Sequence, residues 1–82
     1  MEQQVKHGYL SRFGQGVKKF RSAAGFSQEE LADRAGIDRS YLGGIERGEH
    51  NLALINIIKI ADALSLPPSE LLKSLTTQQA ER

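Results

Sequence analysis

The chain of 82 residues is long enough for one small domain with a single modest core. It contains no cysteine, which excludes disulfide bonds and thiolate metal sites, and no apolar run approaches the roughly 20 residues of a membrane span. The two histidines lie apart, with no carboxylate cluster of metal-ligand spacing beside them. We therefore expect a cytoplasmic protein without a metal, a cofactor or a small-molecule ligand.

The charge is small and unevenly distributed. Residues 1–25 carry five basic side chains and one acidic, residues 26–50 carry three basic and six acidic, and residues 51–82 balance. A basic first segment could contact phosphates, but charge alone favours a solvated helix face. No Ser/His/Asp arrangement, paired-carboxylate site or phosphate-binding loop is recognisable, so the sequence argues against an enzyme.

The apolar spacing predicts helices, and no alternating run typical of a strand is present. The first helix has apolar residues at i, i+4, i+7 and i+11 and ends at Gly25. These apolar residues are Phe13, Val17, Phe20 and Ala24. We expect residues 1–9 to be an N-terminal extension of a domain that spans residues 10–75.

A second, short helix follows Ser27, which forms the capping box "SQEE" with Glu30, and it ends at Gly36. Its inward residues are Leu31, Ala32 and Ala35. A third helix begins after the N-cap Asp38, runs through Arg47 and ends at Gly48. Two helices joined by so short a turn predict a helix-turn-helix, whose second helix can enter a DNA major groove.

The third helix contains two adjacent glycines, Gly43 and Gly44. Each costs about 1 kcal/mol of helix stability relative to alanine. On a helical wheel both point away from the core side, which is marked by Leu42 and Ile45. An outward pair of glycines would let the helix backbone approach another surface closely. The alternative is a loose helix or a loop.

The fourth helix, Leu54 to Leu64, is the most apolar. Its core arc spans about 160° and contains Leu54, Ile57, Ile58, Ile60, Ala61 and Leu64. Ile55 falls outside this arc. Pro67 and Pro68 then set the first turn of a fifth helix, whose apolar residues are Leu71, Leu72 and Leu75. Residues 76–82 are expected to be a flexible tail.

The segments "FSQEELADRAGIDRSYLGGIERGEHN", "IIKIADAL" and "SELL" resemble the Cro/C1-type (XRE) helix-turn-helix family of bacterial and phage regulators. Within it, "DRSYLGGIERG" and "NLALINIIKIADAL" most resemble the controller proteins of restriction–modification systems. The resemblance implies an all-α, lambda-repressor-like bundle of five short helices. It also implies a transcriptional regulator that binds double-stranded DNA.

The resemblance also implies roles for individual residues. The base-facing positions are Arg39, Ser40, Tyr41, Gly43 and Gly44, and the backbone-contacting positions are Ser27, Gln28, Arg47 and Asn51. Arg21 and Glu46 match a pair that bridges the first and third helices. Some family members carry base-reading side chains where this chain has glycines, which raises the share expected from DNA shape. Ser27 could serve only as an N-cap, and the Tyr41 ring could simply lie along the domain edge.

One recognition helix reads few base pairs, so we expect a homodimer on a two-fold operator. The predicted dimer surface is Ile55, Leu66 and Leu72, although the two leucines could equally be core. By resemblance, a controller acts on its own promoter according to its position relative to RNA polymerase. The alternative is an antitoxin-type module that binds a partner protein and regulates DNA secondarily.

Overall fold

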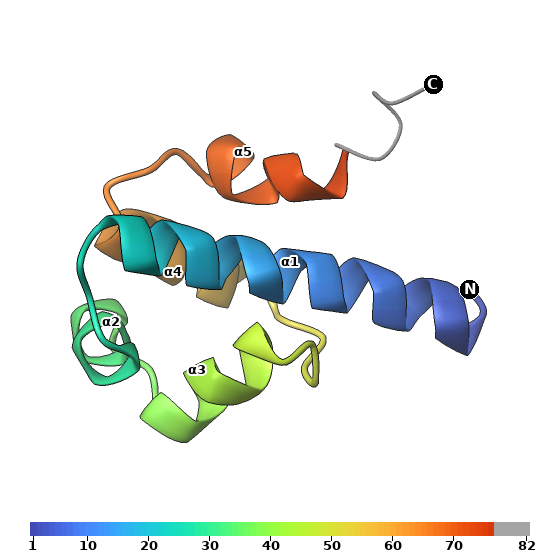
Figure 1. Cartoon of the computed structure of the whole chain (residues 1–82), viewed down its shortest axis with the longest axis horizontal. Helices are drawn as coiled ribbons and strands as arrows, with labels where there is room; N and C mark the ends of the chain where they lie inside the picture. Colours follow the sequence, from blue (N-terminus) through green and yellow to red (C-terminus); the bar gives the residue numbers. More distant parts are fainter. Residues whose placement is uncertain (77–82) are drawn as a thin grey trace.

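A long first helix organises the structure, a computed structural model that describes residues 1–76 (Figure 1). The elements are, in chain order, α1 (Gln3–Ala23), α2 (Gln28–Ala35), α3 (Arg39–Glu46), α4 (Leu54–Ala63), α5 (Pro68–Leu71) and the 3₁₀ helix η1 (Leu72–Leu75). The described residues contain no strand, so the predicted all-α fold of five helices is confirmed. The helices α2 and α3 lie on one side of α1, and α5 lies on the other (Figure 1).

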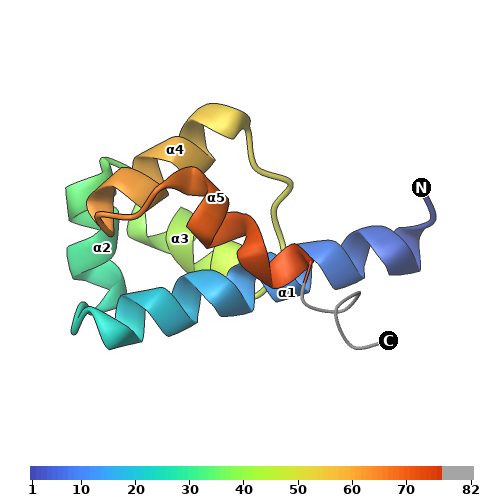
Figure 2. The same cartoon turned by 90° about the horizontal axis from the view of Figure 1, so that it is seen from above.

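The helix α1 has 21 residues and is longer than the short helix expected from the sequence. It begins at Gln3, so most of residues 1–9, the expected N-terminal extension, form its first turns. These turns extend past the other helices (Figure 2). Ala24, expected in the apolar stripe, is exposed because it follows the last helical turn. Residues 77–82 of the expected tail lie outside the described residues.

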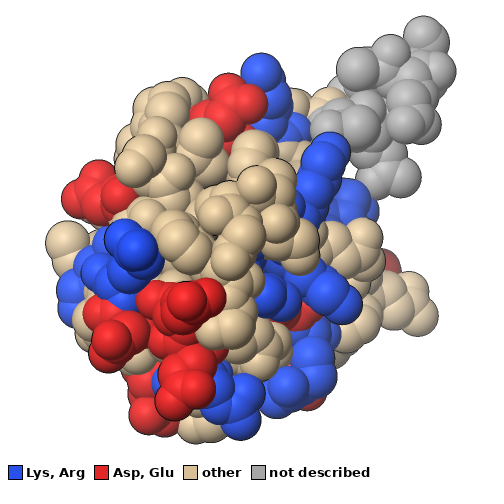
Figure 3. Space-filling model, turned by 60° about the vertical axis from the view of Figure 1, so that its left-hand side comes forward, with Lys and Arg blue, Asp and Glu red and all other residues tan. Residues whose placement is uncertain are grey.

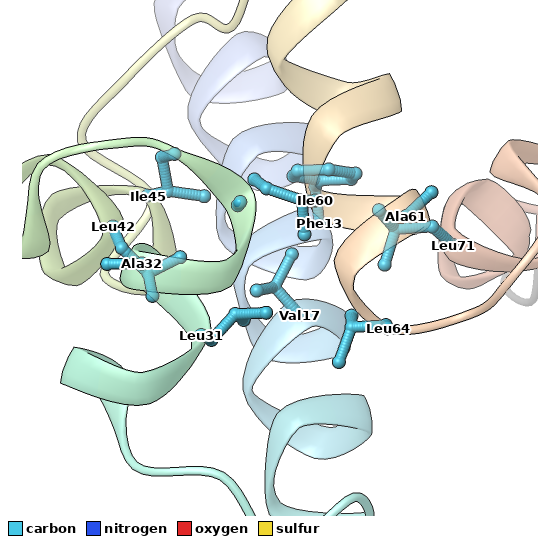
Figure 4. Packing of buried hydrophobic residues seen from close by; sticks show 11 residues of the cluster. Phe13, Val17, Leu31, Ala32, Leu42, Ile45, Ile60, Ala61, Leu64 and Leu71 are labelled. Carbon is cyan, nitrogen blue, oxygen red and sulfur yellow. The ribbon is translucent and has the colours of Figure 1, made fainter.

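The hydrophobic core draws side chains from all five helices (Figure 4). Its buried members are Phe13, Val17, Leu31, Ala32, Ala35, Leu42, Ile45, Ile60, Ala61, Leu64 and Leu71. Leu66 and Leu72 are partly buried and pack against this cluster. Leu54, predicted in the core arc of the fourth helix, is instead 68% exposed. It stands on the first turn of α4, whereas the side chains of α4 that reach the core begin one turn later, at Ile57.

The fifth helix is split into two short pieces. Pro68 occupies the first turn of α5, as predicted, but the α-helical part ends after four residues at Leu71 and continues as η1. Leu71 is fully buried, while Leu75 is partly buried against the core. The apolar side expected from the sequence therefore forms, although the backbone tightens to a 3₁₀ helix.

The crossing of α1 and α3 depends on Gly14, whose role the sequence analysis did not predict. A Cβ atom at Gly14 would lie 2.7 Å from the carbonyl oxygen of Glu46 and still closer to that of Ile45. Both neighbours are backbone atoms, which cannot rotate aside as a side chain can. Glycine therefore allows the C-terminal end of α3 to lie directly on α1.

We predict that Gly14→Ala lowers the free energy of unfolding by about 1–3 kcal/mol, because the added methyl group overpacks a backbone contact. This loss should occur although alanine is the better helix former. Denaturant unfolding of both variants measures it, with Gly8→Ala as the matched control. A Cβ at Gly8 meets only the end of the Arg12 side chain, at 3.6 Å. The control should be neutral or more stable, and equal behaviour of the two variants would contradict the packing argument.

Candidate nucleic-acid interface

The helix α3 presents a polar face outward and is fixed to the core by the opposite face. Leu42 and Ile45 are 0% and 1% exposed, respectively. Arg39 and Ser40, at the beginning of the helix, are exposed, and Tyr41 is half-buried. The first turn of α3 therefore exposes Arg39 and Ser40, while the later turns hold the helix in place.

The turn between α2 and α3 is closed by backbone hydrogen bonds. The N–H of Gly36 donates to the carbonyl of Asp33 (3.2 Å), and the N–H of Ile37 donates to that of Ala32 (3.0 Å). Gly36 has φ of 69°, a left-handed conformation that suits glycine. The turn thus ends α2 and sets the direction of α3 within three residues, as in the predicted helix-turn-helix.

Side-chain capping differs between these two helices. The N–H of Glu30 donates to Ser27 Oγ (3.0 Å), and the N–H of Ser27 donates to Glu30 Oε1 (2.8 Å), which confirms the predicted capping box. Asp38 is the N-cap residue of α3, but the expectation that its side chain caps the helix is wrong. Its carboxylate accepts a hydrogen bond from Ser40 Oγ at 2.7 Å instead. A hydroxyl two residues ahead competes successfully with the backbone donors.

The Glu46 carboxylate joins α3 to α1. Its two oxygens accept hydrogen bonds from Arg21 Nε (2.7 Å) and Arg21 Nη2 (3.0 Å). Glu46 is only 9% exposed. The remaining terminal nitrogen of Arg21, Nη1, donates to the carbonyl of Phe26 at 2.9 Å. The hydrogen bond to Glu46 raises the pKa of Arg21 above its ordinary value.

Gln28 extends this arrangement to the exposed end of α3. Its amide nitrogen donates to Glu46 Oε1 (2.9 Å), and its amide oxygen accepts from Arg39 Nη1 (3.0 Å). This orientation of the amide is the one that suits both neighbours, because a carboxylate needs a donor and a guanidinium needs an acceptor. A continuous row of hydrogen bonds therefore runs from Arg21 in α1 to Arg39 in α3.

The two glycines of α3 are buried, which differs from the expected bare backbone surface. A Cβ at Gly43 would lie 3.2 Å from Arg47 Nη1 and 3.6 Å from Gln28 Oε1, and one at Gly44 would lie 2.5 Å from His50 Nε2. Polar side chains of the chain itself thus occupy the space beside both glycines. The glycines therefore leave space for these polar side chains, and their predicted base-facing role stays a prediction.

Tyr41 is held from two directions. Its hydroxyl oxygen accepts a hydrogen bond from Asn56 Nδ2 of α4 (3.2 Å). Its ring lies against the His50 imidazole, with 4.8 Å between the ring centroids and 46° between the planes. The hydroxyl proton remains available for donation, since Asn56 uses only the oxygen.

Arg47 and Asn51 lie in the segment that connects α3 to α4, and both are exposed. Arg47 forms an ion pair with Glu49, with 2.8 Å between Arg47 Nε and Glu49 Oε2. This hydrogen bond raises the pKa of Arg47 and lowers that of Glu49. Both groups stay charged over the physiological pH range.

Three contributors to this surface were not predicted from the sequence: Glu49, His50 and Asn56. No motif marks them, because their positions depend on how the chain folds back after Gly48, which has φ of 78°. The available signal was the glycine pair itself, since small residues leave space for side chains from the next segment. From the sequence alone, the same space also suits a close approach of DNA to the helix backbone.

Charges of both signs are interspersed on the face shown in Figure 3, with acidic and basic side chains adjacent in its lower half. Among residues 1–76, no group of three or more His, Cys, Asp or Glu side chains is arranged to hold a metal ion. The helices in that range are also too short or too polar to cross a bilayer.

Comparison with known proteins identifies the family. The Helix-turn-helix family profile matches residues 17–71, which contain α2, α3 and α4 entirely. The chain belongs to the Cro/C1-type (XRE) helix-turn-helix family. It is therefore a DNA-binding transcriptional regulator, which is not a class of enzyme.

Among its relatives, the chain is 42% identical over 71 residues to control protein C.BamHI of Bacillus amyloliquefaciens, covering 85% of this chain and 88% of the relative. It is 44% identical over 73 residues to a hypothetical transcription factor of Neisseria meningitidis, covering 80% and 69%. The crystal structure of the restriction–modification controller protein C.AhdI from Aeromonas hydrophila superposes with a TM-score of 0.75 at 53% identity, covering 76% of this chain and 94% of C.AhdI.

We predict that Glu46→Gln lowers the free energy of unfolding by about 2–3 kcal/mol, because the charged hydrogen bonds to a nearly buried arginine are lost. Denaturant unfolding measures the change. Glu70→Gln is the matched control, since Glu70 pairs with Lys73 at 3.4 Å on exposed surface, and such a pair contributes about 0–1 kcal/mol. Equal effects of the two substitutions would contradict a structural role for Glu46.

Proposed function

We propose that the chain binds a two-fold operator as a homodimer, with Arg39 of each subunit reading a base edge in the major groove. The observation that carries this proposal is the position of Arg39. It stands on the exposed first turn of α3, and its guanidinium is held by Gln28 Oε1 at 3.0 Å. A guanidinium that is already oriented loses less conformational freedom on binding. A bidentate contact to guanine contributes about 1–3 kcal/mol of discrimination.

The neighbouring residues suit the remaining contacts to a duplex. Ser40 is exposed beside Arg39, and its oxygen can accept a hydrogen bond while its proton is used by Asp38. Tyr41 has a hydroxyl proton available, and its ring is oriented by His50. We propose that these two side chains contact base edges or adjacent phosphates.

Backbone contacts are proposed at the beginning of α2 and at the end of α3. Gln28 opens α2, where helix N–H groups favour an anion, and Ser27 retains a hydroxyl proton for donation. Arg47 and Asn51 are both exposed beyond α3. Gly43 and Gly44 are proposed to leave space for the side chains of Arg47 and His50, instead of letting the helix backbone approach DNA directly.

A second copy of the chain is the proposed occupant of an apolar surface on α4. Ile55 is 58% exposed, and the adjacent Leu54 is 68% exposed. Two large apolar side chains together on a small domain favour an interface. Leu66 and Leu72 pack largely against the core and would contribute only their exposed parts.

We propose that the regulated genes belong to a restriction–modification system and include the gene for this chain. The names of C.BamHI and C.AhdI, the controller proteins to which it is similar, support this context. Regulation would follow from the position of the bound dimer relative to RNA polymerase, as an activator or as a repressor. An apolar surface such as that of Leu54 and Ile55 would also suit a partner protein, which is the antitoxin-type alternative.

Selection of duplexes from a random-sequence pool, at near-physiological salt, tests the DNA-binding proposal. The wild-type protein should enrich an inverted repeat with half-site centres about 34 Å apart or a multiple of it. Arg39→Ala should lose about 1–3 kcal/mol of preference at one base position per half-site. Arg34→Ala, on the last turn of α2, is the matched control and should select the wild-type sequence. A folded wild-type protein that enriches no sequence would favour the antitoxin-type alternative.

Sedimentation tests the dimer surface. Ile55→Asp should shift the protein to monomers, because a buried unpaired carboxylate opposes association, while the far-ultraviolet circular dichroism stays unchanged. Val5→Asp is the matched control, since Val5 is 46% exposed on the first turns of α1. A dimer that survives the change at Ile55 but not the change at Val5 would move the interface to α1.

A further inference from the structure

The ion pair between Arg47 and Glu49 lies directly beside the recognition helix. Two parallel contacts join the side chains, 2.8 Å from Arg47 Nε to Glu49 Oε2 and 3.2 Å from Arg47 Nη2 to Glu49 Oε1. The side chains are 61% and 53% exposed, respectively. The third guanidinium nitrogen, Nη1, lies 3.2 Å from the place where a Cβ of Gly43 would be. The guanidinium therefore stands on the polar face of α3 with one edge occupied by a carboxylate.

That edge is one that a DNA phosphate could use. Arginine binds phosphates and carboxylates through the same two parallel N–H donors, because both anions present two oxygens at a similar spacing. While Glu49 holds Nε and Nη2, a phosphate can use this edge of Arg47 only by displacing the carboxylate. The released carboxylate would then stand next to the negatively charged DNA backbone.

We propose that Glu49 is an internal competitor of the DNA phosphate at Arg47, and that it weakens binding to every duplex. This proposal rests on the proposed role of Arg47 as a contact to the DNA backbone. Because phosphates are common to all sequences, Glu49 lowers non-specific affinity as well as affinity for the operator. The effect is modest, because exposed ion pairs are weak.

The test measures binding to a duplex of random sequence, so it does not require that the operator is known. We expect Glu49→Gln to bind about two- to fivefold more tightly than the wild type near physiological salt, the range that a surface ion pair can account for. The plot of log affinity against log salt concentration should become steeper, by up to about 0.9 for one added phosphate contact. Fluorescence anisotropy titrations at several salt concentrations give both quantities.

A double-mutant cycle separates the competition from a general effect of charge. Glu49→Gln in an Arg47→Ala background should gain no more affinity than Glu70→Gln does in the wild type. The Glu70→Gln control removes the same charge from α5, where Glu70 pairs with Lys73. Circular dichroism should show that all four variants fold, because every altered side chain is at least partly exposed.

Three results would overturn the proposal. Equal gains with and without Arg47 would mean that Glu49 acts only through its charge. Weaker binding by Glu49→Gln would mean that the carboxylate orients Arg47 toward DNA instead of withholding it. Unchanged binding would mean that the pair does not compete at all. Glu49→Gln could gain affinity only when Arg47 is present, while the wild-type protein enriches no operator in the selection experiment. That outcome would support the competition at Arg47 and contradict the proposed operator binding, so the two failures are distinguishable.

Discussion

The Glu46 carboxylate connects the three helices on which the recognition surface depends. It belongs to the last turn of α3, and it accepts hydrogen bonds from Arg21 of α1 and Gln28 of α2. Because it is nearly buried, its charge would be costly without these partners. The angle between α2 and α3 is therefore fixed by hydrogen bonds as well as by the short turn at Gly36. Arg39 is linked to the same carboxylate through Gln28, so the orientation of an exposed side chain follows from a buried one.

Most of the fold could be predicted from the sequence because its signals are local. The capping box at Ser27 and the glycines that end the helices act within a few residues, and they appear where expected. The failures concern contacts between distant segments. The long α1 continues through polar residues with no start signal, and Gly14 is required by a backbone that lies about 30 positions away in the chain. Leu54 has the helical spacing of a core residue but is exposed. The spacing of apolar residues cannot show where the neighbouring helices end, and so cannot show which turns of α4 they cover.

In the candidate site, too, residues set by local signals could be predicted and residues set by distant segments could not. Arg39, Ser40 and Tyr41 could be placed on the outward side of α3 from the helical period and the family resemblance, and the Arg21–Glu46 pair follows from that resemblance alone. The roles of Glu49, His50 and Asn56 depend on the path of the chain after Gly48. Gly43 and Gly44 illustrate the limit: the sequence indicates that space is needed there, and only the structure indicates what fills it.

Along α3, the residues exposed to solvent are separate from those that anchor the helix to the core, which affects how such regulators can diversify. Arg39 and Ser40 are exposed, whereas Leu42, Ile45 and Glu46 carry the packing and the buried charge. Substitutions in the first turn of α3 therefore change little of the free energy of folding. A duplicated gene could acquire a different operator through one or two changes there while its product kept the same core. Two regulators of this kind could then act in one cell without recognising each other's promoters.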